Sequence, residues 1–421
     1  MSIDNSELLM LLGGKKKAEQ TIGIAGQQGF GVGVYGGDPA DLKAMGLKPM
    51  SGCFNPASDN YGNYIHTNGS VMVFIPAFTI RIGNASAPLY SKYGADTIEI
   101  GDVKLDGTDY ELIPRGFYDG GKLHSGFFID KYLNSKDAEK KQAISVKNGD
   151  PIALSASYNN SSGLPNCVGQ ILDAIELSRT RGEHYSLVSC YQWAVISLIT
   201  QAHAQAATSG DACAWYDASG QKNYPKGNNN NGRDVDDNTI TFTAVGSGSY
   251  SAVRKTGSAV PLAKTTHNGQ RSGICDVNGN MRQPVLGLRY PSIKELKLAK
   301  LSVKMHDFTK DNRNNDDLFD QTSIDNDEDW HYWQRGKALY SDMWGSEWDM
   351  NAVLPKNLIG TSEDAMYGKD FVRLESASDR VLLVAGNYND GTDAGSWYRY
   401  FRSSWFSDSS GVSFRAAAYP P

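Results

Sequence analysis

The five cysteines and seven histidines are the side chains of this chain that most readily do chemistry. The cysteines are Cys53, Cys167, Cys190, Cys213 and Cys275. They are scattered, odd in number and without a C-x-x-C pair, which favours reduced structural thiols over a disulfide framework or a zinc site. The histidines form no H-E-x-x-H motif and no pair at ligand spacing. The cysteines and histidines therefore give no sign of a catalytic centre.

Other catalytic signatures are missing from the sequence as well. No serine lies in a G-x-S-x-G turn between a strand and a helix, and there is no P-loop. The glycines of GQQGFGVG, residues 26–33, are not followed by a long helix that could receive a phosphate. We therefore expect a protein without enzymatic activity.

Two polar stretches predict insertion loops. One is about 208–245, which contains KGNNNNGRDVDDN, and the other is 306–350, which is rich in aspartate and aromatic residues. The aspartates of the second stretch suggest calcium, but no D-x-D-x-D-G loop with a glutamate at the twelfth position is present. A calcium site and a solvated loop both remain open for this stretch.

The C-terminal segment holds an unusual concentration of rings. Six of the ten residues from Trp397 to Phe406 are aromatic, and the others are two arginines and two serines. Tyrosine and tryptophan give large, rigid contact areas, so either the core or a binding surface can use them. In a strand, Trp397, Arg399 and Phe401 would share one side, and Tyr398, Tyr400 and Arg402 the other. We expect some rings, such as Trp397 or Trp405, to be core and the rest to face outward.

Charge and hydropathy exclude several classes of protein. Lys+Arg minus Asp+Glu is 41 − 47 = −6, which argues against a nucleic-acid binder. No stretch approaches the roughly 18 apolar residues that span a bilayer, so we expect no membrane insertion. SELLMLLGG precedes its lysines, the reverse of a secretion signal, so we expect synthesis and folding in a cytosol.

The pattern along the chain predicts an α+β fold with short antiparallel strands, two helices and long loops. Strands are expected over 71–83, broken by Pro76, and over 124–135. One helix is expected over 168–179, ending by Gly182, from apolar residues at helical spacing. A second, over 189–206, opens with Ser189 and Gln192 at capping-box spacing. Their apolar stripes are Val168, Ile171, Leu172 and Ile175, and Ala194, Val195, Leu198, Ile199 and Ala202.

The Gly-rich residues 1–70 differ in composition from 71–421. We predict that 1–70 form a small module for attachment or oligomerisation, and that 71–421 form one domain. An extended N-terminal part of a single domain is the alternative.

Five stretches resemble, in order, the formylglycine-generating-enzyme (sulfatase-modifying-factor) branch of the C-type lectin fold. They are VMVFIPAFTIRIG (71–83), FFIDKYLNS (127–135), YSLVSCYQWAVISLI (185–199), SGICDVNGNMRQPVLG (272–287) and VSFRAA (412–417). The family patterns are M-V-x-I-P-x-G-x-F, F-x-I-D-K-Y-E-V-T, R-L-P-T-E-A-E-W-E-Y-A, G-L-Y-D-M-x-G-N-V-W-E-W and G-F-R-x-A. The resemblance covers about 70–421, and the IDKY and D-x-x-G-N stretches are its more specific parts.

The departures from this family bear on function. Its oxidases use two cysteines shortly before G-F-R, and this chain has none after Cys275; relatives with a histidine iron site need histidines that are absent after His331. A formylglycine-generating-type enzyme that uses Cys275 remains an alternative. A calcium-dependent sugar lectin is another, although Glu-Pro-Asn and Gln-Pro-Asp are absent and RQPVLG is the nearest approach.

The C-terminal segment is similar in composition and place to the ligand-binding region of variable proteins of diversity-generating retroelements, which include phage tropism determinants. The resemblance implies a non-enzymatic, trimeric receptor-binding protein of a phage tail fibre or tail tip. It would be made in the host cytoplasm, join other tail proteins through 1–70, and bind a bacterial surface protein or glycan. It would need no cofactor except a possible structural calcium near Asp276 and Asn278. The ligand-binding residues so implied are Asn387, Tyr388, Asn389, Asp390, Trp397, Tyr398, Arg399, Tyr400, Phe401, Arg402, Ser404, Trp405, Phe406 and Asp408.

Overall fold

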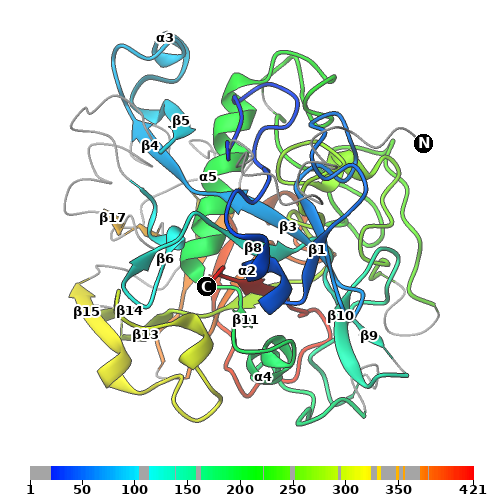
Figure 1. Cartoon of the computed structure of the whole chain (residues 1–421), viewed down its shortest axis with the longest axis vertical. Helices are drawn as coiled ribbons and strands as arrows, with labels where there is room; N and C mark the ends of the chain where they lie inside the picture. Colours follow the sequence, from blue (N-terminus) through cyan, green and yellow to red (C-terminus); the bar gives the residue numbers. More distant parts are fainter. Residues whose placement is uncertain are drawn as a thin grey trace.

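The computed structural model has few helices and several small sheets, an α+β arrangement (Figure 1). It describes residues 20–103, 113–137, 139–157, 163–220, 222–246, 252–292, 295–323, 330–332, 348–349, 354–355, 370–377 and 379–421. The α-helices among them are α2 (Pro39–Ala44), α3 (Tyr90–Tyr93), α4 (Asp173–Arg179) and α5 (Cys190–Ala206).

A six-stranded antiparallel sheet forms the centre of the fold. Its order is β1 (Leu47–Pro49), β2 (Asn63–His66), β3 (Val71–Pro76), β8 (Gly126–Asp130), β22 (Ala416–Ala418) and β11 (Tyr185–Leu187). In β3 and β8, Phe74 pairs with Phe128, and Val73 with Ile129. Because side chains alternate along a strand, the valine and isoleucine enter the large core, and the two phenylalanines enter a smaller core on the other face. Both faces of the central strands are therefore buried. The predicted break at Pro76 is confirmed, because β3 ends at Pro76 and the next strand begins at Phe78.

The predicted boundary at residue 70 lies in the turn between β2 and β3, which are paired strands of this sheet. Ile22, Phe30 and Val32 are fully buried in the large core. Described residues of 20–70 thus contribute to the same sheet and the same core as later segments. The predicted attachment role of 1–70 stays a prediction.

Helix α5 begins as predicted and is more deeply buried than predicted. Ser189 and Gln192 form the expected reciprocal capping box. Every residue from Cys190 to Gln205 is buried, not only the predicted apolar stripe. Two of its buried hydroxyls have partners in later segments: Ser197 donates to the Ser396 carbonyl, and Thr200 to the His267 carbonyl. The helix is therefore enclosed by later segments on the sides that the sequence pattern suggests are polar.

Helix α4 is shorter than the predicted helix over 168–179. The prediction is wrong for residues 168–172, which precede the helix. One carboxylate oxygen of Asp173 accepts hydrogen bonds from the backbone N–H groups of Val168, Gly169 and Gln170. Because the carboxylate takes these donors, the chain makes a turn before Asp173. Val168 is accordingly 66% exposed and not part of a buried stripe.

The remaining strands form smaller sheets, listed here with their bounds. A five-stranded sheet has the order β12 (Gln283–Val285), β20 (Leu382–Val384), β21 (Arg399–Phe401), β19 (Phe371–Leu374) and β16 (Trp330–Tyr332). Three strands pair as β13 (Leu288–Ser292), β14 (Glu295–Ala299) and β15 (Phe319–Ser323). Two-stranded pairs are β4 (Phe78–Ile82) with β5 (Ile98–Asp102), β6 (Tyr118–Asp119) with β7 (Lys122–Leu123), β9 (Asn134–Asp137) with β10 (Gln142–Ser145), and β17 (Trp348–Asp349) with β18 (Leu354–Pro355).

The two predicted insertion loops differ in structure. The described residues of 208–245 carry no helix and no extended strand. The stretch 306–350 contributes β15, which pairs along its length with β14, so its first part belongs to a sheet.

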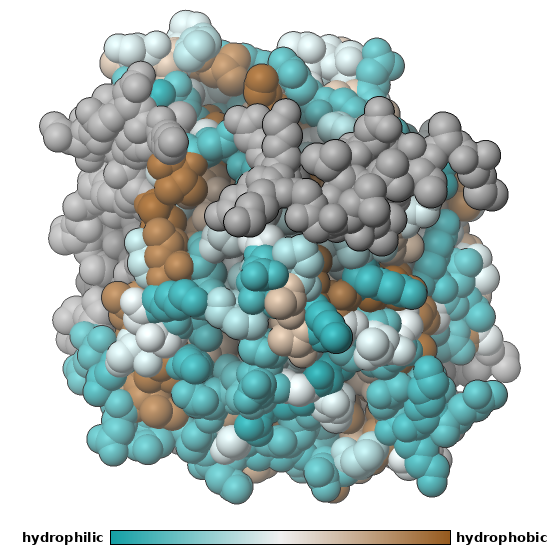
Figure 2. Space-filling model, in the orientation of Figure 1, coloured by the Kyte–Doolittle hydropathy of each residue, from teal (hydrophilic) through white to brown (hydrophobic). Residues whose placement is uncertain are grey.

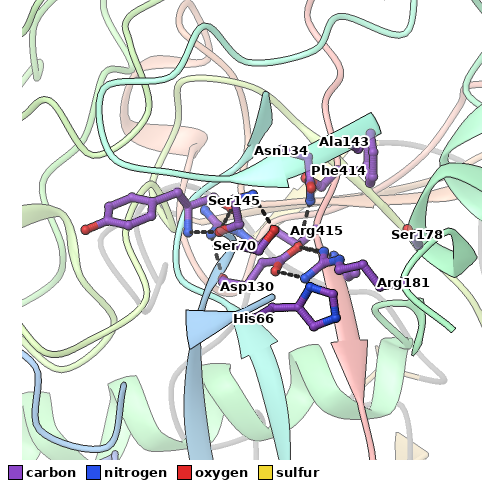
Figure 3. A network of polar contacts seen from close by, with 12 residues as sticks. His66, Ser70, Asp130, Asn134, Ala143, Ser145, Ser178, Arg181, Phe414 and Arg415 are labelled. Carbon is purple, nitrogen blue, oxygen red and sulfur yellow. Dashed lines mark hydrogen bonds and ion pairs between the residues drawn. The ribbon is translucent and has the colours of Figure 1, made fainter. Parts of the chain in front are cut away.

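A buried ion pair joins the central sheet to α4 (Figure 3). Asp130, at the end of β8, accepts two hydrogen bonds of 2.7 and 2.6 Å from Arg181, and neither side chain is more than 2% exposed. The same carboxylate accepts from the Asn134 amide at 2.7 Å and from the Ala416 backbone N–H at 2.8 Å. Arg415 donates to the Asp130 carbonyl at 3.0 Å and to Gln283 at 2.8 Å. These contacts hold β8, β22 and the segment after α4 together.

Two buried histidines bind the N-terminal segment to the core. His203 Nδ1 accepts from the Gly26 N–H at 3.0 Å, and His267 Nε2 donates to the Gly31 carbonyl at 3.0 Å. Burial lowers the pKa of both imidazoles to about 4. Both side chains are therefore neutral in the folded protein near neutral pH.

Replacing Arg181 by glutamine should destabilise the fold by about 3–5 kcal/mol, because Asp130 would stay buried without its partner. The matched control is Arg179→Gln, which removes a partly exposed pair with Glu176 and should cost less than about 1 kcal/mol. Urea unfolding of both variants measures the difference. Equal losses of unfolding free energy would show that the buried pair contributes no more to stability than the partly exposed pair.

The two buried histidines should contribute a loss of stability as the pH is lowered from about 6.5 to about 4, whereas Asp276, whose pKa is raised by burial, contributes in the opposite direction. The unfolded state takes up protons on His203 and His267 below its ordinary pKa near 6.5, whereas the folded state resists protonation down to about 4. Each histidine adds up to about 1.4 kcal/mol of loss per pH unit in this window. Unfolding titrations of His203→Gln should give a slope against pH that differs from that of wild type by the loss of this histidine's contribution. An identical slope in the two proteins would contradict the assignment.

Candidate functional site

The predicted ligand-binding residues divide into an enclosed group and an exposed group. The enclosed residues are Asn387, Trp397, Tyr398, Arg399, Phe401 and Trp405. The others are at least partly exposed: Tyr388, Asn389, Asp390, Tyr400, Arg402, Ser404, Phe406 and Asp408. We call this second group the C-terminal surface. The enclosed side chains offer almost no surface to a partner in the folded chain, and the binding role of the C-terminal surface stays a prediction.

Strand β21 explains why so many rings are enclosed. It is the middle strand of the five-stranded sheet, antiparallel to β20 and parallel to β19. The predicted alternation puts Trp397 and Phe401 in the large core. On the other side, Tyr398 is covered by Phe371, with ring centroids 5.4 Å apart. The expectation that some rings are core is confirmed. Tyr398, which alternation alone would place outward, is buried as well.

Arg399 is a buried cation within this segment. Its guanidinium donates to the carbonyls of Ser396 and Tyr398, both at 3.0 Å, and to the Ser197 hydroxyl at 3.2 Å. Burial lowers its pKa to about 10. Because its donors are directed to the chain itself, Arg399 stabilises the frame and does not face a ligand.

The turn at 387–390 is held by an arginine that the sequence reasoning missed. Arg282 forms two hydrogen bonds with Asp390, of 2.6 and 3.0 Å, and its guanidinium lies 4.5 Å from the Tyr400 ring centroid. Asp390 also accepts from the Asn387 N–H at 2.8 Å. The turn is therefore rigid and presents Tyr388 and Asn389.

The Asn-rich loop of 208–245 lies against this turn. Asn231 donates its backbone N–H to the Tyr388 carbonyl at 2.6 Å, and Gly391 donates to the Asn229 carbonyl at 2.8 Å. Asn231 and Arg233 are exposed. The loop and the turn thus form one surface, which no local pattern could reveal because about 160 residues separate them.

The second exposed part is the turn around Phe406, whose side chain is 52% exposed. The Arg313 guanidinium lies 4.9 Å from the Phe406 ring centroid. Nearby, Glu375 is within 3.7 Å of Arg373, 2.6 Å of Arg380 and 3.3 Å of Arg402. Three arginines thus surround the Glu375 carboxylate, while Asp379 accepts a hydrogen bond from the Ser404 hydroxyl in the same turn, so both signs of charge meet on this part of the surface. The sequence shows Arg402 but gives no signal for its neighbours.

The predicted calcium residues are engaged with the chain. Asp276 is buried and accepts from the Thr256 hydroxyl at 2.6 Å and the Gly257 N–H at 3.0 Å, while Asn278 donates to the Pro225 carbonyl. Burial raises the pKa of Asp276. Within the described ranges, no three His, Cys, Asp or Glu residues are grouped as metal ligands. Calcium binding at Asp276 and Asn278 stays a prediction.

Cys275 is poorly suited to act as a nucleophile. It is fully buried, and burial raises its pKa to about 12. A reactive cysteine needs an accessible thiolate near neutral pH. This environment disfavours the alternative in which Cys275 is a catalytic thiol.

Of the helices described, none is both long and apolar enough to cross a membrane.

No family model matches this chain, and no curated protein matches it. Solved structures similar to it include the U1, M1 and I1 variants of the Major Tropism Determinant, with identities of 11%, 12% and 10% and TM-scores of 0.30, 0.31 and 0.30. The match covers 83%, 83% and 86% of this chain and 63%, 63% and 84% of the respective structures. These TM-scores are too low to establish a shared fold.

Truncation of the adjacent rings at 405 and 406 should change stability by very different amounts. Trp405 is 3% exposed and belongs to the large core, so Trp405→Ala should cost about 3–5 kcal/mol of stability. Phe406→Ala should stay within about 1 kcal/mol, because its ring is half exposed. Urea unfolding of the two variants tests the assignment of inward and outward rings. A larger loss for Phe406→Ala would reverse it.

Proposed function

We propose that this chain is a non-enzymatic receptor-binding protein of a phage tail fibre or tail tip. It binds a bacterial cell-surface receptor through the C-terminal surface. The observation that carries the proposal is the division of one aromatic segment into a buried part and an exposed part. Trp397, Phe401 and Trp405 fix the segment in the core, and Phe406 and Arg402 are left on the outside. The resemblance of the sequence to variable proteins of diversity-generating retroelements supports the same function.

The exposed residues have the properties of a recognition surface. A half-exposed aromatic ring can become a binding anchor when a partner covers it. Arg402 can form paired hydrogen bonds with a carboxylate or phosphate of the receptor. Rigid turns lose little conformational entropy on binding, which favours affinity. A bacterial surface protein or an acidic glycan fits these groups.

The proposal also includes a homotrimeric assembly and a place in the phage virion. Three copies of the chain would present three C-terminal surfaces, and simultaneous binding would raise a weak single-site affinity. Residues 1–70 would join other tail proteins, and the protein would be part of the virion. The buried, protonated thiol of Cys275 supports a role without oxidase chemistry.

The binding test uses the labelled protein and a panel of bacterial strains, read by flow cytometry. Wild type should bind at least one strain, and Tyr388→Ala/Arg402→Ala/Phe406→Ala should weaken that binding at least tenfold, because hot-spot side chains contribute about 2 kcal/mol or more each. The control is Tyr90→Ala/Lys122→Ala/Leu301→Ala, which truncates an aromatic, a cationic and an apolar side chain outside the C-terminal surface. Absence of binding to every strain, or an equal effect of the two triple variants, would count against the proposal.

A further inference from the structure

A second polar site lies on the face formed by the end of α2, the β2–β3 turn, β10 and the segment after α4. Its pocket has a volume of about 490 Å³. The lining residues are Lys43, Ala44, Met45, Gly46, His66, Thr67, Asn68, Lys140, Gln142, Thr180 and Arg181. Figure 2 shows that the lower half of this view, where these elements lie in Figure 1, is mostly hydrophilic. A pocket of this size can hold a sugar-sized ligand.

The charge of the lining is one-sided. It contains three cationic side chains, Lys43, Lys140 and Arg181, and no carboxylate, although the whole chain has a net charge of −6. The nearby carboxylates already have partners. Asp130 is buried against Arg181, and Asp137 lies 3.8 Å from the Lys140 ammonium. Asp130 therefore offsets the charge of the buried Arg181, and Asp137 partly offsets that of Lys140, so the excess positive charge of the lining comes from Lys43 and, in part, from Lys140.

The floor of the pocket is rigid. The Arg181 guanidinium lies 5.2 Å from the Tyr185 ring centroid, and the His66 ring packs edge-on against the same ring at 5.4 Å. The Tyr185 hydroxyl donates to the Met45 carbonyl at 2.7 Å, which fixes the chain after α2. Figure 3 shows His66 beside Arg181 and below Asp130 in that view. These side chains are therefore held in position before a ligand binds.

The lining also carries neutral hydrogen-bonding groups. His66 Nδ1 lies 2.8 Å from the Asn68 side-chain oxygen, and Thr67 and Gln142 add a hydroxyl and an amide. Gly46 has a φ of +70°, and a Cβ at this position would come within 2.9 Å of His66 Nε2. Glycine therefore keeps the space beside the imidazole open.

We propose that this pocket binds an acidic sugar, with a carboxylate or phosphate between Lys43 and Lys140 and the hydroxyls on the neutral lining groups. Cations near a rigid, partly enclosed surface suit an oxyanion, and the amide, hydroxyl and imidazole groups suit sugar hydroxyls. The site is independent of the C-terminal surface, since the two share no residue. Failure of one proposal therefore leaves the other standing.

Calorimetric titration with glucuronate, glucose 6-phosphate, glucose and inorganic phosphate tests this site. At least one of the two acidic sugars should bind at least tenfold more tightly than glucose, and more tightly than inorganic phosphate. Added salt should weaken the binding, because exposed charges are screened. Equal binding of glucose would overturn the role of the anion, and equal binding of inorganic phosphate would overturn the role of the sugar. Absence of binding by both acidic sugars at millimolar concentration would overturn the site.

The variant for the same titration is Lys43→Gln/Lys140→Gln, which should weaken binding of the acidic sugar about tenfold. Lys48→Gln/Lys147→Gln is the matched control, because it makes the same charge change at exposed positions outside the lining. Unfolding curves that superimpose on wild type would show that both variants fold. Equal weakening by the two variants would show that overall charge, and not the pocket, drives binding.

Discussion

The buried ion pair between the Asp130 carboxylate and the Arg181 guanidinium is the interaction on which the rest of this structure depends. Removing a carboxylate and a guanidinium from water is costly, and the cost is offset here because Arg181, Asn134 and the Ala416 N–H all donate to the same group. These donors come from separate parts of the chain, so the pair forms only when β8, β22 and the end of α4 meet. The ion pair therefore specifies one arrangement of distant segments.

The network around Asp130 also helps to position the C-terminal surface and the proposed sugar pocket. Arg415 follows the C-terminal segment and is tied to the Asp130 carbonyl, so the segment that carries Phe406 ends on a fixed strand. Arg181 has Asp130 on one side and the acidic-sugar pocket on the other. One buried network thus supports both an aromatic surface and a cationic pocket, although the two share no residue.

Much of the local structure could be predicted because it depends on neighbouring residues. The strands on either side of Pro76 and the capping box of Ser189 and Gln192 follow from short-range rules. The start of α4 could not be predicted, because it depends on the Asp173 carboxylate, which accepts from the backbone N–H groups of Val168, Gly169 and Gln170 and holds these residues in a turn. The neighbours of the C-terminal surface, Arg282, Arg313 and Asn231, carry no local signal and come from remote loops.

The sequence by itself determined the α+β class, the main strands, helix α5, the even–odd alternation of the C-terminal rings and the absence of familiar catalytic motifs. Only the tertiary structure decided which rings remain exposed, because exposure depends on what covers each side of a strand. Phe371 covers Tyr398, while Phe406 is left half exposed in its turn. The pocket was also decided only in three dimensions, since its lining comes from four separate parts of the chain. Local patterns report periodicity and turns, whereas burial and charge clustering arise from contacts between residues far apart in the sequence.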